Sequence, residues 1–165
     1  MKRPSKIEYY LNIAKEVAQR STCLRRRFGA VIVKDDQIIS TGYVGAPRGA
    51  PNCIDLGICL RDKFNIPPGE RYELCRSVHA EMNAIINAAR AGVSLLGGTL
   101  YLYGEDVKSG EIVGKKPCKL CRRMIINAGL EKVIVKTKDG YDVYDVKKWI
   151  QEDFEKEQRG EFAGY

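Results

Sequence analysis

Hydrophobic residues in the first part of the chain follow a helical spacing and then a strand-like one. Apolar side chains recur every three to four positions over residues 7–18, which is the period of one helix face. Ser5 and Glu8 stand at the start of this stretch with the spacing of a capping box. Residues 29–33 and 37–43 are apolar, β-branched runs separated by a short polar segment. The pattern predicts an amphipathic helix followed by a β-hairpin.

The rest of the chain alternates helical and strand-like patterns. In chain order we expect a helix, a strand, a helix, a strand and a helix, at residues 79–91, 98–103, 118–128, 132–136 and 146–158. Strands joined through helices favour a parallel arrangement covered by helices on both faces, here with the antiparallel hairpin at one side. The sequence therefore predicts a single α/β domain over residues 1–165, ending in a helix and a short polar tail at about 146–165.

Two segments lack a clear period. Residues 44–75 hold four prolines and three cysteines, and residues 104–116 are polar with three glycines. A long loop inside a small domain is usually functional or held in place by something. We expect the first segment to be an ordered loop, with its cysteines as candidates for holding it, and the second to be an excursion from the domain.

The composition is that of a soluble globular protein that prefers anionic partners. Hydrophobic residues make up 44% of the 165 residues and charged residues 30%, and no stretch has the length of a signal peptide core or a membrane span. We therefore expect a cytoplasmic protein with no membrane association. In that reducing compartment six cysteines favour metal ligands or buried thiols over disulfides. A formal charge of +7 favours nucleotides, RNA or DNA without choosing among them.

The only histidine of the chain belongs to a pair of motifs typical of a metal site. His79-Ala-Glu81 begins one expected helix, and Pro117-Cys118-Lys-Leu-Cys121 begins another. A catalytic zinc has three protein ligands and an open position, which His79, Cys118 and Cys121 would supply. The positive end of a helix dipole also favours the two thiolates. A zinc-stabilised domain without catalysis is the alternative, because structural zinc sites share the Cys-x-x-Cys spacing.

Glu81 is the candidate catalytic residue. Zinc lowers the pKa of a bound water to roughly 7, so a nucleophile becomes available at neutral pH. Glu81 lies two residues from His79 but is not needed as a ligand, and a carboxylate in that place suits proton transfer to a leaving group. The motifs therefore predict hydrolytic attack at an amino-substituted ring carbon, with loss of ammonia.

Seven short motifs spread over about residues 5–138 carry a family resemblance. They are residues 20–23, 28–33, 39–45, 52–55, 75–84, 117–121 and 128–133. With them the chain resembles the cytidine and deoxycytidylate deaminase superfamily, and within it the deoxycytidylate (dCMP) deaminase branch. The resemblance implies a three-layer α/β/α sandwich with a mixed five-stranded sheet, conversion of dCMP to dUMP, and homo-oligomers regulated by dCTP and dTTP.

The remaining cysteines also fit this resemblance. Several bacterial and phage members carry a second, structural zinc in similar places, which implies a closed set of four thiolates from Cys23, Cys53, Cys59 and Cys75. Such a site would explain how a proline-rich loop stays ordered. The alternative is that some of the four are buried thiols.

Substrate contacts are expected from a basic segment and from the residues around the second expected strand. Arg25, Arg26 and Arg27 can grip a nucleotide phosphate, or can lie on a solvated face. Ala80, Tyr43 and Val44 occupy places where the family contacts nucleotide. Two departures fall here: Val44 replaces the family asparagine, and Tyr103 with the 105–116 excursion replaces the short connection from the family's strand to its Pro-Cys motif.

Two other functions are compatible with the metal motifs. The tRNA adenosine deaminases share His-Ala-Glu and Pro-Cys-x-x-Cys and act on a flipped base, but the chain has Cys121-Arg-Arg-Met in place of their Cys-x-Gly-Ala continuation. A catalytically idle zinc module that binds nucleic acid is the third candidate, and an unliganded Glu81 argues against it. No motif is evident from Lys147 onward.

Overall fold

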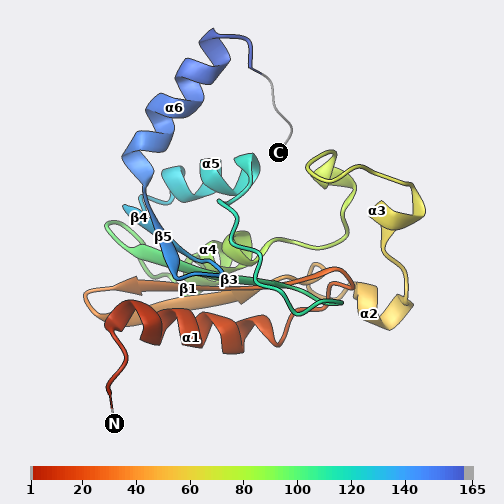
Figure 1. Cartoon of the computed structure of the whole chain (residues 1–165), viewed down its shortest axis with the longest axis horizontal. Coiled ribbons are helices and arrows are strands. Elements are labelled where there is room, and N and C mark those ends of the chain that lie inside the picture. Colours follow the sequence, from red (N-terminus) through yellow and green to blue (C-terminus); the bar gives the residue numbers. More distant parts are fainter. Residues whose placement is uncertain (1, 162–165) are drawn as a thin grey trace.

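Five strands form one mixed sheet in the order β2-β1-β3-β4-β5. The computed structural model describes residues 2–161, and Figure 1 shows helices on both faces of the sheet. The strands are β1 (Arg26–Lys34), β2 (Gln37–Tyr43), β3 (Thr99–Asp106), β4 (Lys132–Lys136) and β5 (Tyr141–Asp145), and the helices of eight or more residues are α1 (Lys6–Ala18), α4 (Ala80–Arg90), α5 (Lys119–Asn127) and α6 (Val146–Gln158). The three-layer α/β/α architecture expected from the resemblance is confirmed.

The expected parallel arrangement holds for one pair of strands only. The β3–β4 pair is parallel, whereas β1–β2, β1–β3 and β4–β5 are antiparallel. The fifth strand, β5, was missed by pattern reasoning, because two of its five residues are aspartates and four of the five residues are exposed. An edge strand of this kind is defined by its pairing with β4 rather than by burial.

Helix α1 covers one face of the sheet. Its capping box is present as expected, since Ser5 accepts from the Glu8 backbone N–H and Glu8 accepts from the Ser5 backbone N–H. Alternate residues of β1, Val31 and Val33, pack against it in a buried cluster that also includes Tyr103. The intervening residues of β1 face the opposite layer, which is the two-residue period of a strand buried on both sides.

Helices α4 and α5 cover the other face, where the metal motifs lie. Gly42 lets α4 lie directly on β2, because a Cβ at this position would come within 2.2 Å of the Ala84 backbone nitrogen. Ser40 donates to the Ala84 carbonyl at 2.7 Å on the same strand. Gly92 follows α4 with a φ of 68°, as expected for a residue that ends a helix. The Gly42 and Ser40 contacts fix α4 relative to the sheet.

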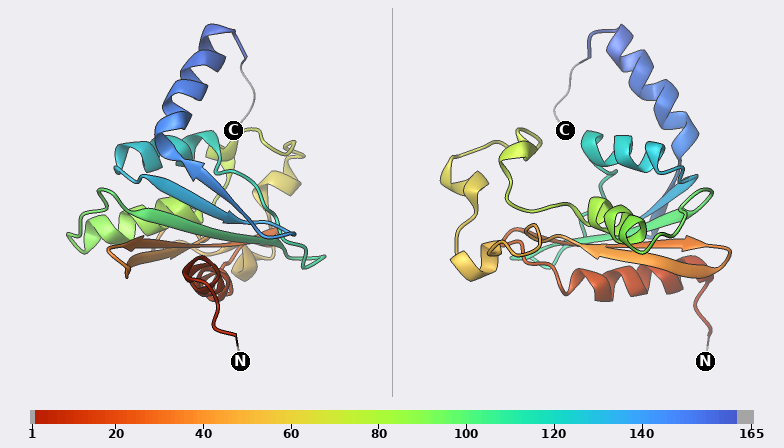
Figure 2. Two further views of the ribbon diagram at one scale, coloured as in Figure 1. Left: turned by 60° about the vertical axis from the view of Figure 1, so that its left-hand side comes forward. Right: turned by 180° about the vertical axis from the view of Figure 1, so that it is seen from behind.

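The segment 44–75 contains two short helices and one 3₁₀ turn. They are α2 (Cys53–Leu56), α3 (Leu60–Lys63) and η1 (Tyr72–Leu74). Figure 2 shows this segment, which we call the cysteine loop, extending from the end of the sheet beyond the amino ends of α4 and α5. The second segment, residues 104–116, begins inside β3 and turns back on it, with a bridge between Glu105 and Ile112.

Helix α6 lies against α5 through paired charges. Trp149 is 1% exposed and anchors its first turns. Arg122 of α5 then pairs with Asp153 at 2.8 Å, and Lys116 pairs with Glu152 at 2.9 Å. The C-terminal region, in which no motif is evident, therefore supplies acidic partners for two basic residues beside the second metal motif. No helix within residues 2–161 is long and apolar enough to cross a membrane.

Candidate active site

His79, Cys118 and Cys121 meet where two helices begin. His79 is the N-cap residue of α4 and Cys118 is the N-cap residue of α5. The His79 Nδ1 lies 3.3 Å from the Cys121 Sγ and 3.4 Å from the Cys118 Sγ. Within residues 2–161 this is the only group of three such side chains whose ligand atoms all lie within 4.8 Å of one another. The structure thus brings together the three residues that the sequence analysis names as ligands.

The charges of this cluster favour a cation. Cys121 hydrogen bonds to Cys118, which lowers the pKa of Cys118 to about 4 and raises the pKa of Cys121 above its ordinary value. Burial of the His79 ring lowers its pKa, but the hydrogen bond with Cys118 and the charge of Glu81 outweigh burial and raise it. One thiol is therefore held as a thiolate by its neighbours, and a divalent cation would allow the second to ionise as well.

Glu81 lies in the first turn of α4, with its carboxyl near the side chains of this cluster. It is 6% exposed. Burial raises the pKa of its carboxyl, and the nearby His79 charge, the helix backbone and the Cys121 thiol only partly counter that effect. A carboxyl whose hold on a proton is strengthened by burial is suited to general acid and base catalysis.

The donor set fits zinc. One imidazole nitrogen and two thiol sulfurs are ligands that zinc prefers, and three of them leave a fourth tetrahedral position open. A closed structural site would need a fourth protein ligand. An ion with four protein ligands can only stabilise the fold, whereas an ion with an open position can also bind water or substrate.

Comparison with known families agrees with this geometry. Residues 4–137 match the family described as the cytidine and deoxycytidylate deaminase zinc-binding region. The chain belongs to this family. The match includes both metal motifs and ends within the segment that follows β4.

Several relatives of this deaminase family member are named deoxycytidylate deaminase. The enzyme of Mycobacterium phage D29 is 39% identical over 139 residues, covering 81% of this chain and 96% of the phage enzyme. The Schizosaccharomyces pombe enzyme is 35% identical over 85% of this chain, but the match spans only 39% of the yeast enzyme. The crystal structure of the cyanophage S-TIM5 dCMP deaminase in complex with dCMP and dUMP matches with 28% identity and a TM-score of 0.59, covering 81% of this chain and 82% of that chain.

The four remaining cysteines gather around the cysteine loop but do not form a compact ligand set in this structure. Cys23 and Cys59 both raise the pKa of Cys53 and of Cys75, although burial is the larger cause in each case. The Cys23 Sγ accepts from the Arg25 backbone N–H at 3.4 Å. The four thiols thus lie within electrostatic range of one another, but no three of them meet the 4.8 Å spacing of the His79 cluster.

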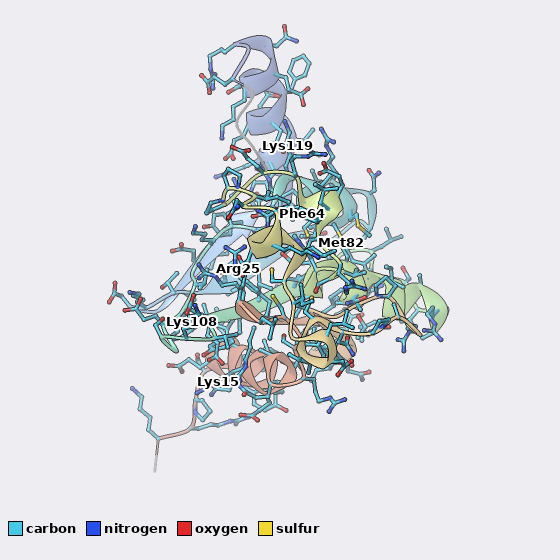
Figure 3. The ribbon with its side chains drawn as sticks, turned by 90° about the vertical axis from the view of Figure 1, so that its right-hand side faces the viewer. Lys15, Arg25, Phe64, Met82, Lys108 and Lys119 are labelled. Atoms are coloured by element: carbon cyan, nitrogen blue, oxygen red, sulfur yellow. The ribbon has the colours of Figure 1, made fainter. Side chains whose placement is uncertain are left out.

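The three arginines expected to bind phosphate each meet a carboxylate of this chain. Arg25 pairs with Asp62 at 3.4 Å, Arg26 with Asp106 at 3.5 Å and Arg27 with Glu105 at 3.2 Å. Figure 3 shows Arg25 below Phe64 and Lys119 on the side of the cysteine loop. Partly exposed pairs of this kind contribute little stability, so they do not prevent an arginine from turning to a phosphate.

The apolar residues expected near substrate are largely buried. Val44 is 7% exposed and Ala80 is fully buried, both in the core cluster beneath α4. Tyr43 is 36% exposed at the end of β2. Tyr103 packs instead on the α1 side of the sheet, where its hydroxyl donates to Glu105 at 2.8 Å. Tyr103 therefore does not occupy the site in place of the family residue, and substrate contact by the other three stays a prediction.

Two asparagines that sequence reasoning passed over hold the site together. The Asn83 side-chain amide donates to the Tyr43 carbonyl at 2.7 Å, tying α4 to the end of β2. The Asn52 side-chain oxygen accepts from the Thr22 hydroxyl at 2.9 Å and from the Ala46 backbone N–H at 3.3 Å. Both lie inside the motifs that carry the family resemblance, and that position was the available signal.

Proposed function

We propose that this chain hydrolyses a pyrimidine nucleotide, most directly dCMP to dUMP and ammonia, with zinc held by His79, Cys118 and Cys121. The observation that carries the proposal is the buried Glu81 carboxyl beside a three-ligand cluster. A site with three ligands and an adjacent unliganded acid has the parts of a hydrolytic centre, whereas a structural site needs only ligands. Zinc, when bound, supplies the Lewis acidity that lets water act as a nucleophile at neutral pH.

The chain's own residues handle the proton. Glu81 takes a proton from the attacking water and gives it to N3 of the cytosine ring, as the water oxygen bonds to C4 and the C4=N3 double bond becomes single. It then moves the remaining hydroxyl proton to the exocyclic amine, and the C4–N bond to that amine breaks to release ammonia as the C4=O bond forms. One water is consumed for each ammonia released, and Glu81 returns to its starting state. The burial of Glu81 keeps this proton from exchanging with bulk solvent.

The names of the relatives favour dCMP over the other substrates. Both phage comparisons involve a deoxycytidylate deaminase, and the cyanophage structure contains dCMP and dUMP. Deamination of another base or of tRNA adenosine, and a non-catalytic zinc module that binds nucleic acid, are the competing functions. They differ from the proposal in which molecule releases ammonia, or in releasing none.

Ammonia release from a panel of substrates tests the proposal. The panel contains dCMP, CMP, dCTP, deoxycytidine, guanine and tRNA, each with and without a chelator. We expect dCMP to react fastest and the chelator to abolish the reaction. Turnover of tRNA or guanine alone would replace dCMP as the substrate, and absence of turnover in protein with full zinc content would support the non-catalytic module.

We also propose a second, structural zinc bound by Cys23, Cys53, Cys59 and Cys75. Their mutual influence on pKa, and the location of three of them in the cysteine loop, support it. Four thiolates would close a tetrahedral site and hold the loop in place. We expect two zinc ions per chain in the wild type and one in both His79→Ala and Cys59→Ser, with a lower melting temperature only in the second. One zinc per undamaged chain would remove this site.

Phosphate binding by Arg25, Arg26 and Arg27, with contacts from Tyr43, Val44 and Ala80, is our proposal for substrate recognition. Neutralising the three arginines should raise the Michaelis constant for dCMP more than for deoxycytidine, because only dCMP carries a phosphate. Equal increases in the Michaelis constants for both substrates would show that the arginines only form ion pairs within the fold and do not bind phosphate.

The remaining expectations concern the setting of the enzyme. We propose that residues 1–165 act as one cytoplasmic domain that assembles into a homo-oligomer and responds to dCTP and dTTP. Light scattering of the purified protein measures the assembly, and dCMP turnover with each nucleotide added measures the response. A monomer with unchanged rates would refute both parts.

A further inference from the structure

A buried cation in the cysteine loop is connected to the metal cluster through one aromatic ring. Arg61 of α3 is 5% exposed. Its guanidinium lies 4.8 Å from the centre of the Tyr72 ring. The Tyr72 ring in turn meets the His79 ring edge to face, with 5.3 Å between ring centres and 69° between planes. We call these three residues the Arg61–Tyr72–His79 stack.

Arg61 stabilises the turn before Tyr72 by donating hydrogen bonds to its carbonyl groups. Its guanidinium donates to the carbonyl of Pro67 at 2.7 Å and to that of Arg71 at 3.3 Å, and it also donates to the carbonyl of Glu70. Arg71, immediately before Tyr72, adopts a left-handed φ of 48°, which is uncommon for a residue other than glycine. A single buried side chain therefore satisfies three carbonyls of a turn that would otherwise be unfavourable.

The turn can affect the metal cluster because Tyr72 packs against the ring of His79. The Nδ1 of His79 faces the two thiols, so the usefulness of His79 as a ligand depends on how its ring plane is held. Groups that orient a metal-binding imidazole affect metal affinity and activity by roughly 10- to 100-fold. Edge-to-face packing is a directional contact that restricts such a ring plane.

We propose that Tyr72 is a positioning residue for the His79 ligand, and that Arg61 holds Tyr72 in place. Cys59 and Cys75 bracket both residues in the sequence. The loop that carries the proposed structural zinc thereby also orients a ligand of the catalytic zinc. This inference rests on the proposed function, because it requires zinc at His79.

Two replacements of Tyr72, one that keeps the aromatic ring and one that removes it, test the proposal. Tyr72→Phe keeps the ring and removes the hydroxyl, whereas Tyr72→Leu removes the ring. Zinc affinity is measured by competition with a chelator, and the contribution of the His79 site is identified by subtracting the behaviour of His79→Ala. We expect Tyr72→Leu to bind zinc at this site about 10- to 100-fold more weakly and Tyr72→Phe to stay within about threefold of wild type.

A second pair of variants separates positioning from general damage to the loop. Arg61→Met should weaken the same site, whereas Arg71→Met removes only an exposed ion pair with Glu73 and should leave it unchanged. The visible ligand-field spectrum of the Co²⁺ protein should shift in Tyr72→Leu but not in Phe64→Leu, since Phe64 is an exposed residue of the same loop. These spectra report on ligand geometry, which a purely structural role would not change.

The outcomes distinguish this inference from the function on which it rests. If His79→Ala keeps the full zinc content and activity of the wild type, the proposed function fails. If wild type binds zinc at His79 but Tyr72→Leu has the wild-type affinity and spectrum, only the positioning role is overturned. Should Tyr72→Leu not fold, Arg61→Lys carries the same test, because it keeps the charge but cannot reach three carbonyls at once.

Discussion

Replacing Glu81 with glutamine should abolish turnover while leaving the fold and the metal intact. Glutamine has nearly the same shape but cannot accept and return a proton. General acid and base catalysis contributes roughly 10²- to 10⁴-fold, which corresponds to about 2.7–5.4 kcal/mol of barrier at about 1.36 kcal/mol per tenfold. Because Glu81 is 6% exposed and burial raises its pKa, its charged form is disfavoured by the fold. The neutral variant should therefore be at least as stable as the wild type.

The assay combines three measurements on Glu81→Gln. They are kcat for dCMP from ammonia release, zinc content per chain, and the melting temperature. Glu105→Gln is the matched control, because Glu105 is also a buried carboxyl but interacts with Arg27 and Tyr103 on the α1 side of the sheet. We expect the control to keep its kcat and to lose stability. A Glu81→Gln protein with kcat within tenfold of wild type would show that another group moves the proton.

Three further predictions concern the structure around the site. Gly42→Ala should be strongly destabilising in denaturant unfolding, since its Cβ would lie 2.2 Å from a backbone atom of α4. Gly45→Ala is the control and should be mild, because its Cβ would meet its nearest atom at 3.4 Å. Equal losses of stability in the two variants would contradict the close approach of α4 to Gly42. Asp153→Asn should lower the free energy of unfolding by about 1–3 kcal/mol, because it leaves the partly buried Arg122 without its charged partner, and an unchanged denaturation midpoint would be inconsistent with that pairing. The pKa of Tyr103 is raised to about 12 by burial and its hydrogen bond to a carboxylate, so the stability it contributes is present below about pH 10 and is lost as the pH rises toward 12. In Tyr103→Phe that loss should disappear, and an identical alkaline unfolding profile in both proteins would refute the assignment.

The family match rests on motifs whose residue spacing can be recognised in the sequence before the fold is known. His79, Glu81, Cys118 and Cys121 could be predicted because each pair lies within one or two residues of a helix start, where local geometry decides which way the side chains face. The helices α1, α4 and α5 were predicted for the same reason: their apolar period is local. The lone histidine narrowed the choice of ligands further, since no second imidazole competes with it.

Features that depend on distant partners were not predictable in this way. The partners of Arg25, Arg26 and Arg27 come from residues 62, 106 and 105, so a segment that looks like a free basic rim is paired in the fold. Likewise, the acidic side chains of α6 find the basic side chains around α5 only because Trp149 anchors the helix there.

The sequence by itself determined the chemistry of this protein, namely a histidine, two thiols and a carboxyl at two helix starts, because those residues act over distances that a few bonds fix. Only the tertiary structure decided how that chemistry is supported. The side of the sheet that Tyr103 faces follows from the register of β3 against β1. The contact of Tyr72 with His79 follows from a turn closed by Arg61. Both features depend on packing between segments far apart in the chain, and neither can be predicted from a local sequence pattern.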